Sequence, residues 1–281
     1  MTISATYNAL YQLADKAIPR NAGCYRKVEV LTRPGTCLDV AFPAPSVGGN
    51  TETQPRIVFL VLGALAAAVP ERVSASEGCT ACNFLIGGEN PKTGEYFAHY
   101  HFEASGWGGR PTADGNDVQN HIIGNCRITP IEVFETRFPV TVLSYELIPD
   151  SGGAGRFRGG LASRRVMRID APEMRTSMLM DYSRHGPWPL FGGKPGRPAR
   201  VSVRRAGSDR YVPFTEAFGT KSASKFADVR LNRGDEVCIE SCGGAGYGDP
   251  LQRAAELVDF DLAQGFVSAE AAVAFYGRAP A

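Results

Sequence analysis

The hydrophobic positions follow a helical period near both ends of the chain. Apolar residues at helical spacing predict an amphipathic helix over Ser4 to Ile18. A second helix is predicted from Gln54 to Val69, because Thr51 with Gln54 matches a capping box and Pro55 suits a first turn. The apolar residues of this second segment leave almost no polar face, so we expect it to be buried on several sides.

From Tyr96 onward the pattern changes to short runs of alternating or β-branched residues, separated by glycine and proline. The predicted strands are YFAHYHFE, PVTVLSYELI, SRRVMRI, RVSVRRA and DEVCIES. The tail returns to helix in LQRAAELVDFDLAQG, with a glycine C-cap, and in SAEAAVAFYG, with Ser268 as N-cap. We therefore predict an α+β fold with a helical or mixed segment over 1–95, a β-rich domain over 96–250 and a helical tail over 251–281.

The composition excludes several classes of protein. Lys plus Arg (30) nearly balance Asp plus Glu (29), so the chain lacks the basic excess that a nucleic-acid partner requires. The longest apolar run, Ile57 to Val69, is too short to cross a bilayer, and Asp15 and Lys16 interrupt the N-terminal apolar residues. We expect a cytoplasmic protein with no membrane partner, in which the seven cysteines are reduced thiols.

The glycine-rich stretch Asp150 to Gly160, DSGGAGRFRGG, resembles a phosphate-binding loop only in its glycines. A Walker-type loop needs a Lys followed by Ser or Thr, because these residues contact the phosphates and Mg²⁺. Here the glycines lead into Arg156 and Arg158, and the next residues have a strand pattern. We predict a turn between strands, whose amides and arginines leave contact with an anion open.

Two short patterns have the spacing of metal or redox sites. Cys79 and Cys82 form a CxxC pair, but no second pair lies at zinc-ribbon distance. His99 and His101 share one face of a predicted strand, and Glu103 continues that face. Both patterns also occur in ordinary structure, and we expect structural thiols and no metal bound by this chain.

The most polar part of the chain is the glycine-framed stretch Ser105 to Pro130. It is typical of a site on a rigid β-scaffold, although a solvated surface loop has a similar composition. Its polar and aromatic residues include Trp107, Arg110, Asp114, Asp117, Asn120, His121, Asn125, Arg127 and Thr129. No GxSxG or HExxH motif is present, so the residues alone leave the chemistry open.

Six stretches, in order along the chain, resemble the hydantoinase B/5-oxoprolinase family, which includes subunits of acetone and acetophenone carboxylases. The matching stretches are IPRNAGCYRKVEV, PAPSVGGNTETQPRIVFLVLGAL, GGRPTADG, NCRITPIEVFETRFP, ELIPDSGGAGRFRGG and CGGAGYGDP. They extend over nearly the whole chain but correspond to the C-terminal half of a typical family member. The resemblance therefore implies one part of a larger multi-subunit fold.

The resemblance implies a subunit of an ATP-dependent hydrolase of cyclic amides, such as hydantoins or lactams, that acts through a phosphorylated substrate. Two alternatives stay open: a subunit of an ATP-dependent ketone carboxylase, and a non-catalytic structural subunit of such a complex. In the family, an A-type subunit with an actin-like fold handles ATP, and a divalent-metal stretch belongs to the N-terminal half. That stretch has no counterpart in this sequence.

From the resemblance we expect no cofactor bound by this chain alone. ATP with Mg²⁺, and a divalent transition metal such as Mn²⁺ or Zn²⁺, are expected to act through partner subunits. The expected partners are a polypeptide equivalent to the N-terminal half of the B-type subunit, the A-type subunit and a small-molecule substrate. We also expect the chain to be an obligate partner that is not active alone.

The resemblance also suggests which residues face the substrate. The expected substrate-binding residues are Asn50, Glu52 and Thr53 from GGNTET, Arg110 and Asp114 from RPTADG, Asn125, Arg127 and Thr129 from NCRITP, and His121 between them. Arginines would hold anionic groups, and amides would orient the substrate. The alternative is that these residues only fix loops or subunit contacts. The family assigns no role to His99, His101 or Glu103, and catalytic residues stay unassigned.

Overall fold

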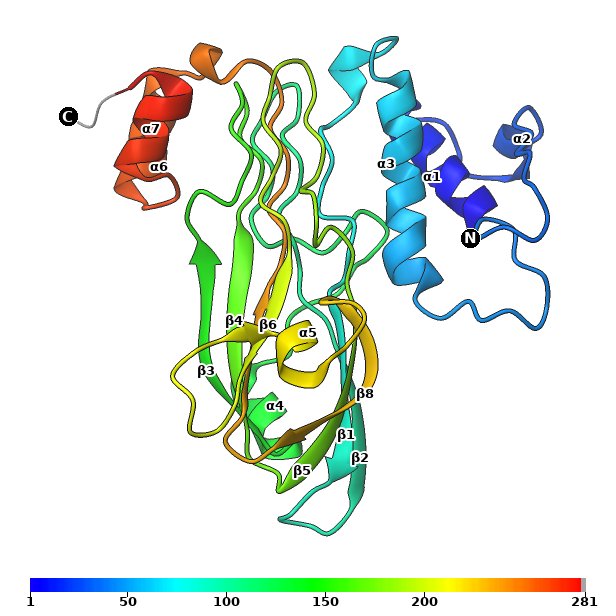
Figure 1. Cartoon of the computed structure of the whole chain (residues 1–281). Coiled ribbons are helices and arrows are strands. Elements are labelled where there is room, and N and C mark those ends of the chain that lie inside the picture. Colours follow the sequence, from blue (N-terminus) through cyan, green and yellow to red (C-terminus); the bar gives the residue numbers. More distant parts are fainter. Residues whose placement is uncertain (279–281) are drawn as a thin grey trace.

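The computed structural model describes residues 1–278, which form an α+β structure with helices toward both ends and two antiparallel sheets between them (Figure 1). The helices are α1 (Thr2–Leu13), α2 (Ala22–Tyr25), α3 (Gln54–Leu65), α4 (Ile131–Arg137), α5 (Phe214–Phe218), α6 (Ala255–Ala263) and α7 (Ala269–Tyr276). One π-helical turn (Gly49–Thr53) and two 3-10 turns (Pro70–Arg72 and Pro250–Gln252) complete the helical elements of this part of the chain. The predicted fold class is confirmed.

Within the described residues the strands form one sheet of four and one of five. The first has the order β2 (Tyr96–His101), β1 (Asn83–Glu89), β5 (Glu173–Leu179) and β8 (Lys225–Asn232). The second has the order β3 (Val140–Ile148), β4 (Ala162–Ile169), β9 (Glu236–Glu240), β6 (Arg200–Arg204) and β7 (Val212–Pro213). The five strands expected from the pattern are confirmed as β2, β3, β4, β6 and β9.

Sequence patterning missed β1, β5, β8 and the two-residue β7. Two glycines interrupt the alternation in β1, and β5 places Thr176 between two buried methionines, which weakens the apolar signal. Because β1 pairs with β2, the four-stranded sheet extends across the boundary proposed at residues 95 and 96. The division into 1–95, 96–250 and 251–281 stays a prediction.

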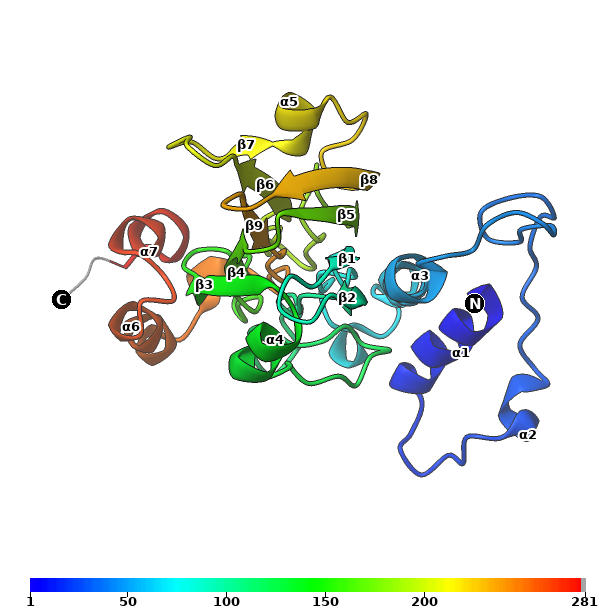
Figure 2. The ribbon, with the colours of Figure 1, turned by 90° about the horizontal axis from the view of Figure 1, so that it is seen from below.

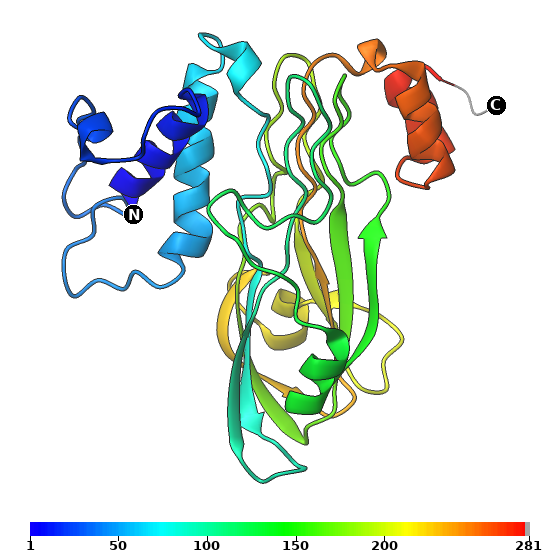
Figure 3. The ribbon, with the colours of Figure 1, turned by 180° about the vertical axis from the view of Figure 1, so that it is seen from behind.

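One hydrophobic core lies between the two sheets. It takes alternate side chains from both, such as Phe84 and Met174 from the first sheet and Met167 and Ile239 from the second. Burial of apolar area of this kind contributes about 25 cal/mol per Å². On the side seen in Figure 3, α4 lies beside the strands and adds Phe134 to the core.

Glycine-rich extended segments run side by side at one end of the sheets, between α3 and the C-terminal helices (Figure 1). They pack backbone to backbone: the amide of Gly106 donates to Cys242 O at 2.9 Å, and that of Gly160 donates to Trp107 O at 2.7 Å. A Cβ on Gly106 would lie 1.9 Å from the oxygen of Gly160, so only glycine fits there. The stretch Asp150 to Gly160 is one of these segments and connects β3 to β4.

The N-terminal helices form a second, smaller core on one side of the molecule (Figure 2). Ala5 and Ala9 of α1 pack against the face of α3 that carries Val58 and Leu62. The expectation that α3 is buried on several sides is wrong at Leu60, which is 65% exposed. The predicted capping box is also wrong: the chain is already helical before α3, and the N-cap residue makes no side-chain capping bond.

The C-terminal helices α6 and α7 lie on the opposite side of the molecule from α1 and α3 (Figure 2). Ser268 accepts a hydrogen bond from the amide of Ala271 at 3.1 Å, which confirms the predicted N-cap. The left-handed conformations of Gly265 and Gly277 agree with the predicted ends of the two helices. Over residues 1–278, no helix has both the length and the apolar character that a membrane crossing requires.

Candidate functional site

Two adjoining hollows open beside β2, the edge strand of the four-stranded sheet. The first, of about 180 Å³, is lined by His99, Tyr100, His101, Phe102, Ala104, Tyr145 and the segments 118–120 and 126–129. The second, of about 350 Å³, is lined by Asn50, Thr51, Gln54, Ala81, Tyr100, Phe102, Asn120, His121 and the segment 123–126. Because Tyr100, Phe102, Asn120 and Cys126 line both, we treat the two as one site and call it the edge hollow.

Five of the expected substrate-binding residues line the edge hollow. Asn50, from the π-helical turn, lines the larger part together with His121 and Asn125. Arg127 and Thr129 line the smaller part. The structure thus brings together amide, imidazole and guanidinium groups from two segments that lie far apart in the sequence.

Glu52 is buried and supports the wall of the edge hollow from inside. Its carboxylate accepts hydrogen bonds from the amides of Ala81, at 3.0 Å, and Asp181, at 3.1 Å, and from the side chain of Asn83. Asn83 in turn accepts a hydrogen bond from the hydroxyl of Tyr100, which lines the hollow. Burial raises the pKa of Glu52 to about 8, against the lowering effect of hydrogen bonds from Thr80 and from the amides of Ala81 and Asp181.

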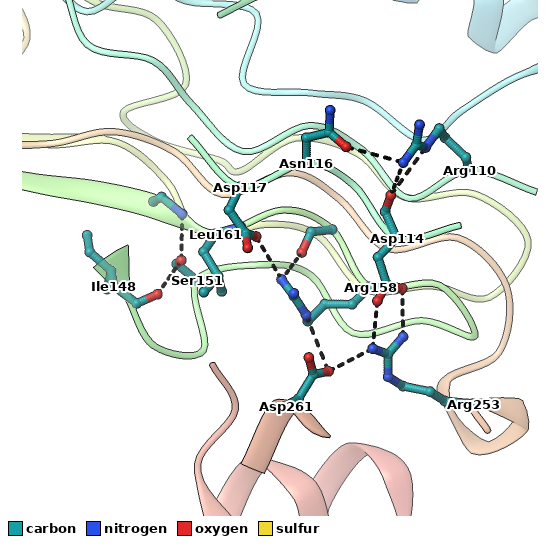
Figure 4. A network of polar contacts seen from close by, with 12 residues as sticks. Arg110, Asp114, Asn116, Asp117, Ile148, Ser151, Arg158, Leu161, Arg253 and Asp261 are labelled. Atoms are coloured by element: carbon teal, nitrogen blue, oxygen red, sulfur yellow. Dashed lines mark hydrogen bonds and ion pairs between the residues drawn. The ribbon is translucent and has the colours of Figure 1, made fainter. Parts of the chain in front are cut away.

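Thr53, Arg110 and Asp114 lie outside the lining of the edge hollow. Thr53 is the N-cap of α3. The guanidinium of Arg110 donates to the backbone oxygen of Asp114 at 2.7 Å, and the Asp114 carboxylate accepts two hydrogen bonds of 2.7 Å from Arg253 (Figure 4). These partners hold the glycine-rich loop against the C-terminal segment, and the substrate roles of the three residues stay predictions.

Arg253 belongs to a buried ion network that joins the glycine-rich segments to α6 (Figure 4). Asp261 of α6 accepts a hydrogen bond from Arg253 at 2.7 Å and lies 3.4 Å from Nε of Arg158. Arg158 also contacts Asp117 at 3.2 Å. Arg158, one of the two arginines of DSGGAGRFRGG, therefore has a structural partner on both sides.

Sequence reasoning grouped His99, His101 and Glu103 but missed the partners that join them in a charged network on the β2 side of the edge hollow. Nε2 of His101 lies 2.8 Å from Oε1 of Glu103, and the guanidinium of Arg165 donates to the same oxygen. The Arg165 guanidinium also lies 3.9 Å from the ring centroid of Tyr145. Tyr145 and Arg165 come from β3 and β4 of the other sheet, so no spacing in the sequence could have grouped them with β2.

Burial and charge set different protonation states in this network. Burial alone would raise the pKa of Glu103, which is 1% exposed, but His101 and Arg165 hold that pKa below its ordinary value. Burial, together with the charge of His101, lowers the pKa of His99 to about 4. At neutral pH the network therefore contains an ionised carboxylate and a neutral His99. Residues 1–278 contain no group of three or more His, Cys, Asp or Glu side chains arranged to hold a metal ion.

All seven cysteines lie within the described residues and carry free thiols. Cys79 and Cys82 are buried, and burial raises the pKa of both thiols well above the ordinary value. A thiol that is protonated and inaccessible is a poor nucleophile and a poor metal ligand. This environment agrees with the expected structural role of the CxxC pair.

Comparison with solved structures finds the same architecture in part of an ATP-dependent enzyme. The crystal structure of ATP-dependent caprolactamase from Pseudomonas jessenii superposes with a TM-score of 0.85 at 28% identity. The match covers 100% of this chain and 48% of that chain. The fold of the described residues is therefore the fold of about half of a caprolactamase polypeptide.

The family model for hydantoinase B/oxoprolinase matches residues 1–250, and the chain belongs to this family. The B-type component of a putative D-/L-hydantoinase from Pseudomonas sp. (strain NS671) is 29% identical over 259 residues, which are 92% of this chain and 42% of the relative. The acetophenone carboxylase delta subunit from Aromatoleum aromaticum is 27% identical over 304 residues, with coverage of 96% and 43%. This chain spans less than half the length of these relatives.

Proposed function

We propose that the chain is a subunit of an ATP-dependent hydrolase of cyclic amides, of the hydantoinase or oxoprolinase type. The observation that carries this proposal is the structural match to caprolactamase over 100% of the chain, because caprolactam is a cyclic amide. The match to the B-type component of a putative hydantoinase, also named for a cyclic amide, supports the same substrate class.

The proposed reaction proceeds through a phosphorylated substrate. A lactam carbonyl is a poor electrophile, and transfer of a phosphoryl group from ATP to its oxygen makes the ring carbon easier to attack. Such a step needs a site that excludes water and presents cationic and amide donors to the developing negative charge. The edge hollow offers donors of this type in Asn50, Asn125 and Arg127.

We propose that ATP with Mg²⁺ is bound by an A-type subunit and that a divalent metal, Mn²⁺ or Zn²⁺, is bound by the part equivalent to the N-terminal half of the B-type subunit. The exposed apolar side chains around the N-terminal helices support contact with that part. Phe42 is 99% exposed, and Leu31, Val47 and Leu60 are also largely exposed. Covering 1,000 Å² of apolar area would contribute about 25 kcal/mol before the costs of association.

Assay of the assembled complex tests the function. The complex should form ADP in step with ring opening of hydantoin, 5-oxoproline or caprolactam, and omission of ATP should abolish ring opening. The relationship to an acetophenone carboxylase subunit makes ketone carboxylation the second candidate. ATP-dependent incorporation of labelled bicarbonate into acetone or acetophenone, without ring opening of any amide, would replace the first proposal by the second. A complex with neither activity would leave this chain a structural subunit.

A further inference from the structure

The imidazole of His101 is held in one orientation at the wall of the edge hollow. Its Nε2 is anchored 2.8 Å from the buried carboxylate of Glu103, and its ring centroid lies 5.5 Å from that of Phe134. Among the hydrogen bonds of residues 1–278, none reaches the other ring nitrogen, Nδ1. The side chain is 12% exposed and lines the hollow. One nitrogen is therefore fixed, and the other is free to meet a bound molecule.

Titratable and charged side chains surround His101 in this part of the edge hollow. Those that contact it or line the same part of the hollow are Glu103, Arg165, His99, Tyr145, Cys126 and Arg127. Glu103 is ionised but paired with Arg165, and His99 is neutral. Burial raises the pKa of Tyr145 to about 12, so its hydroxyl keeps its proton. A histidine next to a carboxylate and facing a hollow has the arrangement of a general acid or base.

We propose that His101 is the proton-transfer residue for the cyclic amide and that Glu103 is its positioning residue. This inference rests on the proposed function. Transfer of the phosphoryl group from ATP to the lactam oxygen releases ADP, the ring N–H loses its proton to solvent, and a carbon–nitrogen double bond is left in the ring. A water oxygen then bonds to the ring carbon, the electron pair of the double bond moves to nitrogen, and the proton lost by water passes through Nδ1 of His101 to that nitrogen. Carbon gains OH, nitrogen gains H, and His101 returns to its starting state. The ring carbon–nitrogen bond then breaks as the OH proton passes to nitrogen and the O–H electron pair forms the carbonyl, which leaves an amine and an acyl phosphate. A second water attacks the acyl phosphate and releases inorganic phosphate.

Removal of the imidazole tests this step in the assembled complex. His101→Gln should lower kcat by about 10²-fold or more and remove the acidic limb of the pH profile, because general acid–base catalysis contributes about 10²–10⁴-fold. The matched control is His185→Gln, since His185 is exposed and outside the edge hollow. Glu103→Gln should move the acidic limb to lower pH, because loss of the negative charge disfavours the imidazolium. A purely structural Glu103 would change stability without moving that limb.

A binding measurement separates this inference from the proposed function. The chain has four histidines, so NMR of the complex with labelled histidine in this chain can follow each ring. Hydantoin should shift the resonances and the titration midpoint of His101 and leave those of His185 unchanged. If the complex opens the ring and His101→Gln keeps kcat and the pH profile, the inference is wrong and the function stands. If the complex opens no ring and hydantoin leaves His101 unshifted, both fail.

Discussion

At the scale of single residues, a buried carboxyl group fixes a loop that lines the edge hollow. Glu77 is 1% exposed, and its Oε1 accepts a hydrogen bond of 2.9 Å from the amide of Ile122, within the 118–129 segment. Its Oε2 is buried without a hydrogen-bond partner in the described part of the chain. Burial raises the pKa of Glu77 to about 8, so this carboxyl holds a proton at neutral pH in the folded protein.

This raised pKa predicts a pH-dependent stability. Between pH 4.5, the ordinary pKa, and about 8, the folded state keeps a proton that the unfolded state has lost. The free energy of unfolding therefore falls as pH rises through this range, by up to about 1.4 kcal/mol per pH unit for one group. Glu77→Gln should flatten this slope in denaturant titrations at several pH values. Part of the slope should remain in the variant, because the pKa of Glu52 is shifted in the same direction.

The exposed Glu95→Gln is the control for this prediction and should leave the slope unchanged. An identical slope in the wild type and in Glu77→Gln would show that Glu77 is ionised in the folded protein. The loop around Ile122 would then be anchored by a carboxylate and not by a neutral carboxyl group.

At the scale of elements, buried charges attach the C-terminal helices. The apolar cluster of α6 and α7 is small, with Val258, Val267 and Ala272 as its buried members. Asp261 of α6 has a side chain only 2% exposed and interacts with two arginines of the preceding segments. Breaking a buried ion pair by removing one partner costs about 3–5 kcal/mol, because the remaining charge loses its compensation.

We therefore predict that Asp261→Asn weakens the attachment of α6 and α7. The variant should lose several kcal/mol of stability, and hydrogen exchange should rise in both helices before it rises in the sheets. Asp259→Asn is a matched control in the same helix, since its pair with Arg278 is exposed and worth about 0–1 kcal/mol. Equal effects of the two variants would mean that the buried network does not hold the helices.

The close packing of the glycine-rich segments predicts that alanine will be tolerated less well there than at an open turn glycine. Gly106→Ala would place a Cβ 1.9 Å from one backbone oxygen and 2.4 Å from a backbone nitrogen. A Cβ on Gly94 would meet no atom within 4 Å. Gly94 has a positive φ of +71°, however, which is a strained conformation for alanine. The Gly94 variant should cost about 1–2 kcal/mol, and the Gly106 variant should cost more or prevent folding. Thermal unfolding of both checks this, and an equal cost would contradict the close backbone packing.

At the scale of the whole molecule, both ends of the chain expose large apolar side chains, and more of them lie at the N-terminal end than at the C-terminal end. Large apolar side chains are exposed around the N-terminal helices, where Phe42 and Leu60 are examples. Clusters of this kind mark interaction surfaces in soluble proteins. In the proposed assembly this side contacts the polypeptide equivalent to the N-terminal half, over a large hydrophobic interface.

We predict that Leu60→Asp weakens this assembly by at least about tenfold in affinity, since burying an unpaired charge in an apolar interface costs more than about 1.4 kcal/mol. Leu251→Asp is the control, because Leu251 is similarly exposed, at 69%, but lies in the Pro250–Gln252 turn, which packs against α7. Co-expression followed by size-exclusion chromatography measures the outcome. A complex that forms equally well with both variants would place the interface elsewhere.

The sequence by itself determined the elements whose signal is local. Helices at both ends, five strands and the cap at Ser268 follow from periodicity and capping chemistry, which depend on neighbours a few residues apart. The glycines of Asp150 to Gly160 are not followed by the Lys and Ser/Thr pair of a phosphate-binding loop, and this was enough to predict a turn between strands. Residue motifs, read together along the chain, were enough to identify the family.

Only the tertiary structure decided which residues share a site. Glu103 and Arg165 are separated by 62 positions and meet because β2 and β4, from different sheets, approach at the edge hollow. Asp114 is predicted from the sequence to bind substrate, and only the structure shows that its carboxylate also pairs with Arg253, 139 positions away. Side-chain roles of this kind depend on packing between segments that lie far apart in the sequence. Hydrophobic periodicity reports only the environment of each segment, so it contains no information about such packing.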